Sequence, residues 1–227
     1  MPERITFTTS DHITIVGDWV TSPTMIGAVL LLHMMPATRQ SWAQLQRLLA
    51  TQGVASLAID LRGHGESTHD RHNAVLDYRR FTDPEHAASI EDVAGAVQWI
   101  RARGIEPARI AIAGASIGAN LALWYLSENP VIPAAALLSP GENYHGISAL
   151  DAAPNVLPHQ SVWMAASSGD DDESVRAVDA IATLIDPEQV TVEKLVSAGH
   201  GTHMLQADAA LTNRLAEWLR DRILATS

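Results

Sequence analysis

The feature that most constrains the fold is a regular alternation between short apolar runs and amphipathic stretches of helix length. The apolar runs span residues 28–33, 54–60, 109–116, 134–141, 161–168 and 190–199. Most of them lack alternation between apolar and polar residues, which is typical of strands covered on both faces. The stretches with helical spacing span residues 41–53, 89–104, 117–130, 173–185 and 211–223. This order predicts an α/β fold in which helices cover both faces of a mostly parallel sheet.

The N-terminal segment has a different pattern. Residues 5–7 and 13–20 alternate apolar and polar side chains and are separated by a short polar stretch, which predicts an antiparallel hairpin. A length of 227 residues suits one domain, and no repeat, low-complexity tract or linker marks a boundary. We therefore predict a single domain over residues 1–227. The connection 141–160 is too short for a folded cap, so we expect an open site.

Composition excludes several classes of protein. The chain has no cysteine, which removes disulfides, thiolate nucleophiles and cysteine-bound metals. The net charge of −11 has the wrong sign for binding nucleic acid or an anionic membrane surface. The first residues are acidic and polar where a signal peptide needs an apolar run. We expect a cytoplasmic protein whose partner is a small molecule.

A G-x-S-x-G pentapeptide, Gly114 to Gly118, lies where a predicted strand passes directly into a predicted helix. So sharp a turn needs glycine on both sides of the serine, because side chains there would collide with the neighbouring strand and helix. The Ser116 hydroxyl would then be exposed at the sheet edge. The first amides of the helix would favour negative charge on a substrate oxygen. The pentapeptide thus predicts Ser116 as a nucleophile and the amide of Ile117 as an oxyanion donor.

A serine hydroxyl attacks poorly until a base accepts its proton and a third group orients the base. His200 follows the last predicted strand and is flanked by glycines, so we predict it as the base, with His203 a weaker alternative. The acid is expected after the strand 161–168, because the chain order Ser, Asp, His is typical of this architecture. The acidic residues there are Asp170, Asp171, Asp172 and Glu173. The residues alone leave the choice among the three aspartates open.

A second oxyanion donor is expected at the end of the strand 28–33, which leads into His33-Met34-Met35. We predict the amide of Met35 as this donor and His33 as a supporting residue. The other histidine cluster, around His64 and His69, follows a strand with glycines typical of turn chemistry. We predict neither a metal site nor a cofactor.

The motifs together resemble those of the α/β-hydrolase superfamily, and within it small esterase-like members without a cap. The resemblance rests on LLLHMMP, VASLAIDLRGHGES, IAGASIGAN, LLSPG and GHGTHML, in this order along the chain. It implies an eight-stranded, mostly parallel sheet whose second strand is antiparallel. It also implies a triad of Ser116, Asp171 and His200, because Asp171 and Ser174 match the D-x-x-S arrangement of such esterases. One departure is that Met34 stands where the family usually has glycine after His33. We expect its side chain to narrow the part of the site that holds the acyl group, and the Met34 amide stays an alternative to the Met35 amide.

These observations predict a cofactor-free serine hydrolase that cleaves carboxylic esters through an acyl-enzyme. Met34, Tyr144 and His145 are the expected substrate-binding residues. Alternatives on the same triad are thioester, lactone or peptide hydrolysis, because the pocket rather than the fold decides the substrate. A binding protein without activity is the alternative from another class. The oligomeric state is left open.

Overall fold

The structure, a computed structural model, describes residues 2–169 and 171–225. Its strands are β1 (Glu3–Thr8), β2 (Ile13–Val20), β3 (Gly27–Leu32), β4 (Val54–Ile59), β5 (His69–Asp70), β6 (Ile110–Ala115), β7 (Ala134–Leu138), β8 (Asn143–Tyr144), β9 (Ile147–Ser148), β10 (Ser161–Ser168) and β11 (Val190–Val196). Its α-helices are α1 (Ala43–Thr51), α2 (Asp83–Ala87), α3 (Ile90–Arg101), α4 (Ile117–Glu128), α5 (Ala149–Ala152), α6 (Asp172–Ala182), α7 (His203–Ala207) and α8 (Ala209–Leu224). Short 3₁₀ helices are η1 (Arg39–Trp42), η2 (Tyr78–Arg80), η3 (Pro107–Arg109), η4 (Ala153–Asn155) and η5 (Pro187–Gln189).

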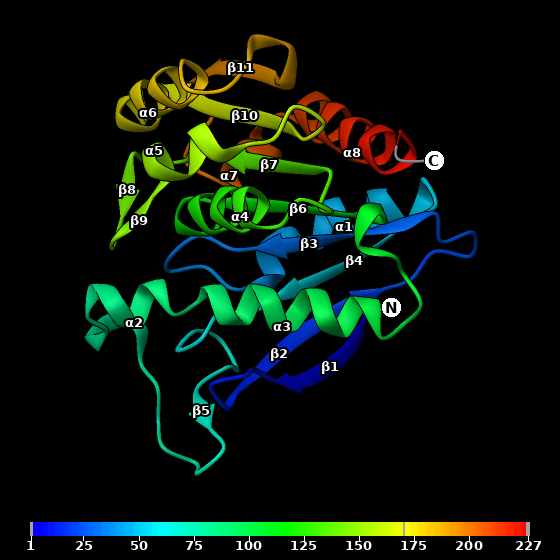
Figure 1. Cartoon of the computed structure of the whole chain (residues 1–227), viewed down its shortest axis with the longest axis vertical. Helices are drawn as coiled ribbons and strands as arrows, with labels where there is room; N and C mark the ends of the chain where they lie inside the picture. Colours follow the sequence, from blue (N-terminus) through cyan, green and yellow to red (C-terminus); the bar gives the residue numbers. More distant parts are fainter. Residues whose placement is uncertain (1, 170, 226–227) are drawn as a thin grey trace.

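The central sheet has the strand order β1-β2-β4-β3-β6-β7-β10-β11 (Figure 1). From β4 to β11 neighbouring strands are parallel, whereas β2 is antiparallel to both β1 and β4. The two-residue strand β5 pairs with β2 beside this path. The prediction of an eight-stranded, mostly parallel sheet with an antiparallel second strand is therefore confirmed along this path.

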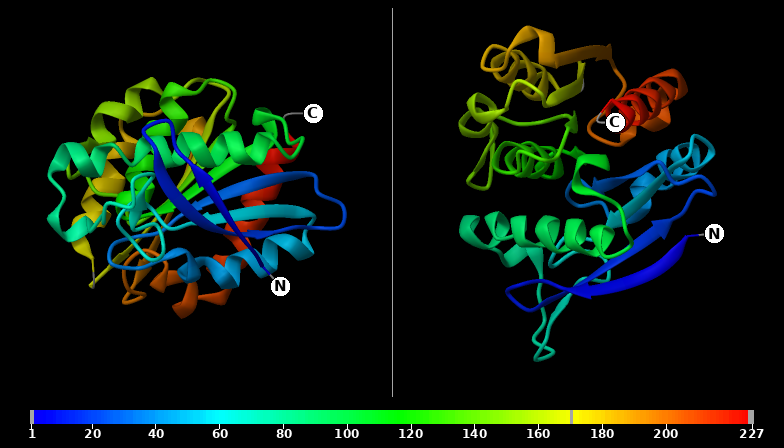
Figure 2. Two further views of the ribbon diagram at one scale, coloured as in Figure 1. Left: turned by 90° about the horizontal axis from the view of Figure 1, so that it is seen from below. Right: turned by 45° about the vertical axis from the view of Figure 1, so that its right-hand side comes forward.

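Helices cover both faces of the sheet, as the views in Figure 2 show. Alternate residues of a strand point to opposite faces, so Leu30 and Leu32 lie in one core cluster and Val29 and Leu31 in the other. The first cluster packs against α3, α4 and α6, and the second against α1, α7 and α8. Every residue of β3, β4, β6 and β7 is buried. This explains the apolar runs without alternation.

Most element boundaries agree with the sequence pattern to within a few residues. The start of α1 differs, because η1 precedes it and Trp42 rather than Ser41 occupies its N-cap position. The connection between β7 and β10 contains the β8–β9 hairpin, α5 and η4 rather than a cap domain. Figure 1 shows this hairpin on the same side of the molecule as α2.

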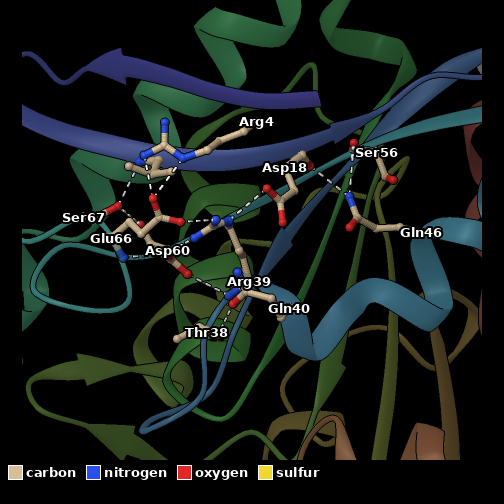
Figure 3. Close-up of polar contacts among 11 residues, drawn as sticks. Arg4, Asp18, Thr38, Arg39, Gln40, Gln46, Ser56, Asp60, Glu66 and Ser67 are labelled. Atoms are coloured by element: carbon tan, nitrogen blue, oxygen red, sulfur yellow. Dashed lines mark hydrogen bonds and ion pairs between the residues drawn. The ribbon is translucent and has the colours of Figure 1, made fainter. Parts of the chain in front are cut away.

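An ionic network around a buried carboxylate anchors the loops that follow β3 and β4 (Figure 3). The Asp60 carboxylate is fully buried and accepts hydrogen bonds from the amide of Arg39 (2.8 Å) and the amide of Glu66 (2.9 Å). It also forms an ion pair with the Arg39 guanidinium, whose Nε lies 3.0 Å from the Asp18 carboxylate. Glu66 pairs with Arg39 as well and, at 2.6 Å, with Arg4. We call Arg4, Asp18, Arg39, Asp60 and Glu66 the Asp60 network.

We predict that Asp60→Asn lowers the free energy of unfolding by about 3–5 kcal/mol. The substitution keeps the shape of the side chain but leaves the buried Arg39 guanidinium without its innermost counter-charge. Urea unfolding of the two proteins measures the difference. Lys194→Ala, which removes the exposed ion pair with Asp179, is the control and is expected to change stability by no more than about 1 kcal/mol. Equal effects of the two substitutions would contradict a central role for Asp60.

Candidate active site

Ser116 occupies a strained turn between β6 and α4. Its φ of 53° is positive, a backbone conformation that residues other than glycine rarely adopt. The glycines on both sides are required by contact: a methyl group on Gly114 would lie 1.9 Å from the carbonyl oxygen of Gly118, and one on Gly118 would lie 2.5 Å from the carbonyl oxygen of Leu32. Such strain persists only where surrounding structure imposes it, as at nucleophile turns.

His200 and Asp171 form a hydrogen-bonded pair at the ends of β10 and β11. The Nδ1 atom of His200 lies 2.6 Å from Oδ2 of Asp171, and Asp171 also caps α6 by accepting from the amide of Ser174 at 3.3 Å. Burial acts to raise the pKa of Asp171, but hydrogen bonds with Ser174 and His200 outweigh it and leave this pKa below its ordinary value. The carboxylate is therefore ionised at neutral pH and can hold the imidazole in one orientation.

The other acidic candidates are placed differently. Asp172 is exposed in the first turn of α6 and accepts from the amide of Gly169 at 2.9 Å. Asp170 lies outside the described residues. His203 begins α7 and is exposed. The described contacts thus favour Asp171 and His200 among these alternatives.

Contacts of Gly201 bring the His200 loop to the end of β6. A methyl group on Gly201 would lie 3.3 Å from Cβ of Ala115, the residue before Ser116, and 2.5 Å from Sδ of Met34. The amide of Gly201 donates to the Ser139 hydroxyl at 2.9 Å. The loop after β11 is therefore packed directly beside the strand end that presents Ser116.

Two buried serine hydroxyls hold this loop, and sequence reasoning missed both. Ser139 follows β7, and Ser167 near the end of β10 accepts from the amide of Ala198 at 2.7 Å. Asn120 was also missed: its side chain binds the backbone of Gly141 and of Ile147. A polar amide within the apolar stretch 117–126 is a signal that could have found Asn120, because buried polar groups need partners. Serines at strand ends carry no comparable signal.

The peptide between Met34 and Met35 is oriented by His33. The amide of Leu61 donates to Nε2 of His33 at 3.0 Å, so Nδ1 carries the ring proton and donates to the carbonyl oxygen of Met34 at 2.9 Å. In a trans peptide the N–H points opposite to the C=O, so the Met35 amide faces away from the His33 ring. The amide of Ile117 begins α4, where helix geometry supplies no partner. Both amides remain the predicted oxyanion donors.

The three predicted substrate-binding residues lie in three environments. Met34 is only 4% exposed and belongs to the core cluster beneath the His200 loop, so its side chain supports that loop. Tyr144 is half-buried; burial raises the pKa of its hydroxyl, and the side chains of Ser174 and Ser116 act to lower that pKa. His145 instead pairs with Asp83 at 3.0 Å and stacks on His86. Of the three, Tyr144 is the one whose pKa is affected by the Ser116 side chain.

No group of side chains able to hold a metal ion occurs in residues 2–169 and 171–225. In the same part of the chain, no helix has the length and apolar character needed to cross a membrane.

Residues 27–162, more than half of the chain, match the family described as alpha/beta hydrolase fold. The chain belongs to this family. No curated protein sequence matches it.

Several solved structures share the fold at low identity. An esterase of Pyrococcus furiosus has a TM-score of 0.76 and 20% identity, over 98% of this chain and 93% of that one. The alpha/beta hydrolase GrgF of Penicillium has a TM-score of 0.80 and 14% identity, over 99% of both chains. Proline iminopeptidase of Mycobacterium smegmatis has a TM-score of 0.77 and 13% identity, over 99% of this chain and 100% of that one. This alpha/beta hydrolase thus shares its fold with relatives of several activities.

Buried histidines beside the site should make the protein sensitive to acid. Burial lowers the pKa of His33 to about 4, and burial with the neighbouring His33 ring lowers the pKa of His64 to about 3. In the unfolded chain both rings titrate near pH 6.5, so below that pH the unfolded state binds more protons than the folded state. The contribution of these two neutral rings to the free energy of unfolding is fully present above pH 6.5. It should fall as the pH drops toward the folded-state values, by at most about 1.4 kcal/mol per pH unit for each ring.

We predict that His64→Phe reduces this pH slope by about 1 kcal/mol per unit on average between pH 6.5 and 5. Phenylalanine keeps the stacking on Tyr78, whose ring centre lies 3.8 Å from that of His64, and removes the titrating group. Urea unfolding at several pH values measures the slope. His72→Phe, at an exposed position, should retain the wild-type slope. A His64→Phe slope equal to that of the wild type would show that His64 does not titrate as inferred.

Proposed function

We propose that this alpha/beta hydrolase is a serine esterase that cleaves small carboxylic esters, with Ser116 as nucleophile, His200 as base and Asp171 as the orienting acid. The observation that carries the proposal is the His200–Asp171 hydrogen bond on a loop packed against the strand end that presents Ser116. A strained serine alone would suit a tight turn. A strained serine beside an oriented imidazole suits nucleophilic catalysis.

In the proposed mechanism, His200 accepts the proton of Ser116 as its oxygen attacks the ester carbonyl. The amides of Met35 and Ile117 stabilise the negative charge that develops on the carbonyl oxygen. His200 then donates the proton to the leaving alcohol, and an acyl-enzyme remains. Water, deprotonated by His200, releases the acid and restores Ser116. Asp171 stays ionised throughout and stabilises the imidazolium, consistent with its lowered pKa.

The residues named above are sufficient for the proposed reaction. The residues named provide a nucleophile, a base, an acid and two amide donors, which are the parts that acyl transfer requires. The ester class is favoured by the sequence resemblance and by the P. furiosus esterase among the structural relatives. Assays on thioesters, lactones and aminoacyl p-nitroanilides, run beside esters, separate the other acyl transfers.

We predict that Ser116→Ala lowers kcat for p-nitrophenyl acetate by about 10⁶ and abolishes labelling by a fluorophosphonate probe. The fold should persist, because the side chain becomes smaller and the turn is set by its neighbours. Circular dichroism checks the fold, and gel fluorescence measures labelling. Wild-type protein that neither labels nor hydrolyses any of these substrates would identify a binding protein rather than an enzyme.

We predict that Asp171→Asn lowers kcat by about 10⁴, because the amide no longer holds His200 in the productive tautomer. Asp172→Asn is the matched control: it alters the adjacent exposed aspartate and should retain nearly full activity. Steady-state kinetics at pH 8 measure both. If kcat falls instead in Asp172→Asn while Asp171→Asn stays active, Asp172 rather than Asp171 is the residue that orients His200, and the rest of the mechanism is unchanged.

A further inference from the structure

The β8–β9 hairpin places an aromatic side chain at the proposed nucleophile. In the strand order, β3 lies on one side of β6 and β7 on the other, so the loop with Met35 and the hairpin after β7 flank Ser116. The Tyr144 ring lies against Gly141, which follows β7. The side chains of Ser174 and Ser116 act to lower the pKa of the Tyr144 hydroxyl, which is consistent with a position near both. Tyr144 therefore lies on the side of Ser116 that faces the hairpin, where part of a bound substrate would be.

The base of the hairpin is fixed to the helix that begins at the nucleophile. Asn120, one turn into α4 and fully buried, donates to the carbonyl oxygens of Gly141 (2.9 Å) and Ile147 (2.8 Å) and accepts from the amide of Gly141 (3.1 Å). A methyl group on Gly141 would lie 2.6 Å from Cζ of Tyr144, so the ring packs directly against this backbone. The position of Tyr144 is thus tied to the position of Ser116.

The tip of the hairpin is fixed to α2. Nδ1 of His145 lies 3.0 Å from Oδ1 of Asp83, and the His145 ring stacks on the buried ring of His86 with centres 4.1 Å apart. The next residue, Gly146, also faces α2, because a methyl group on it would lie 3.7 Å from Cβ of Asp83. Contacts at both ends of the hairpin therefore oppose the movement of Tyr144 away from Ser116.

We propose that Tyr144 is the specificity-determining side chain of this site and restricts it to esters with a small group on the side of Ser116 that the hairpin covers. The inference rests on the proposed esterase function and deepens it. Burial raises the pKa of Tyr144, against smaller effects of Ser174 and Ser116, so the phenol is neutral and presents a compact, uncharged wall. The hairpin fills space that a chain without a cap domain would otherwise leave open.

The test compares two substrate series on wild-type, Tyr144→Ala and Tyr144→Phe proteins. One series is p-nitrophenyl esters from acetate to octanoate, and the other is acetate esters from methanol to octanol, followed in a pH-stat. In Tyr144→Ala the ratio of kcat/KM for the longest to the shortest member should rise by about tenfold or more in one series, because truncation opens the wall. That series identifies the covered side. Tyr144→Phe keeps the ring and should hold the ratio within about threefold.

Two further variants test whether a change in the kcat/KM ratio is specific to Tyr144 and its hairpin or follows from any loss of packing near the site. Tyr125→Ala removes a half-buried tyrosine elsewhere on α4 and should leave the ratio within about threefold of wild type. His145→Ala frees the hairpin tip from α2 and should raise the ratio in the same series as Tyr144→Ala, by a smaller factor; it serves as the test if Tyr144→Ala does not fold.

The outcomes distinguish this inference from the proposed function. Unchanged ratios in both series, in protein that hydrolyses short esters and reacts with the fluorophosphonate probe, overturn the role of Tyr144 and leave the esterase in place. An equal rise in Tyr125→Ala also overturns it. Wild-type protein without hydrolysis or labelling overturns the proposed function, and this inference with it.

Discussion

The buried carboxylate of Asp60 is the interaction on which the geometry of the candidate site depends. It stands at the end of β4 and binds the amides of Arg39 and Glu66, so one charge fixes the loops after two neighbouring parallel strands. Its desolvation is compensated by the Arg39 guanidinium, and removing one partner of such a pair is far more costly than losing a surface pair. The loop with the Met35 amide is thereby held at its far end by Asp60 and at its near end by His33.

Neutral groups hold the opposite side of Ser116. Asn120 binds the base of the β8–β9 hairpin, and the hydroxyls of Ser139 and Ser167 bind the His200 loop. Each neutral hydrogen bond contributes about 1 kcal/mol, which is less than breaking a buried ion pair costs. The structure therefore combines one side that is held by a buried charge and carries the Met35 amide with another that is held mainly by neutral hydrogen bonds and carries Tyr144.

Local patterns were sufficient for the sheet, for the main helices and for the candidate nucleophile. The buried strands are apolar runs in the sequence, and the glycines that the Ser116 turn needs stand two residues before and two residues after the serine. The residues alone did not separate Asp171 from Asp172, because both lie at the start of the same helix; the resemblance favoured Asp171, and in the structure it is Asp171 that contacts His200. The hairpin, α2 and the partners of Asn120 were not predicted, because they depend on contacts such as His145 with Asp83 between segments distant in sequence.

Met34 shows how a departure from the family pattern is absorbed. Where the resemblance implies glycine, this chain has a side chain that enters the core beneath the His200 loop instead of extending toward substrate. The space it fills is the space that a side chain at position 201 would need, since a methyl group there would lie 2.5 Å from Sδ of Met34. Glycine at 201, whose φ of 57° itself favours glycine, leaves room for the Met34 side chain. Because the proposed oxyanion donor is the amide of Met35, oriented through the Met34 carbonyl by His33, the Met34 side chain packs under the site while the adjacent peptide keeps its orientation.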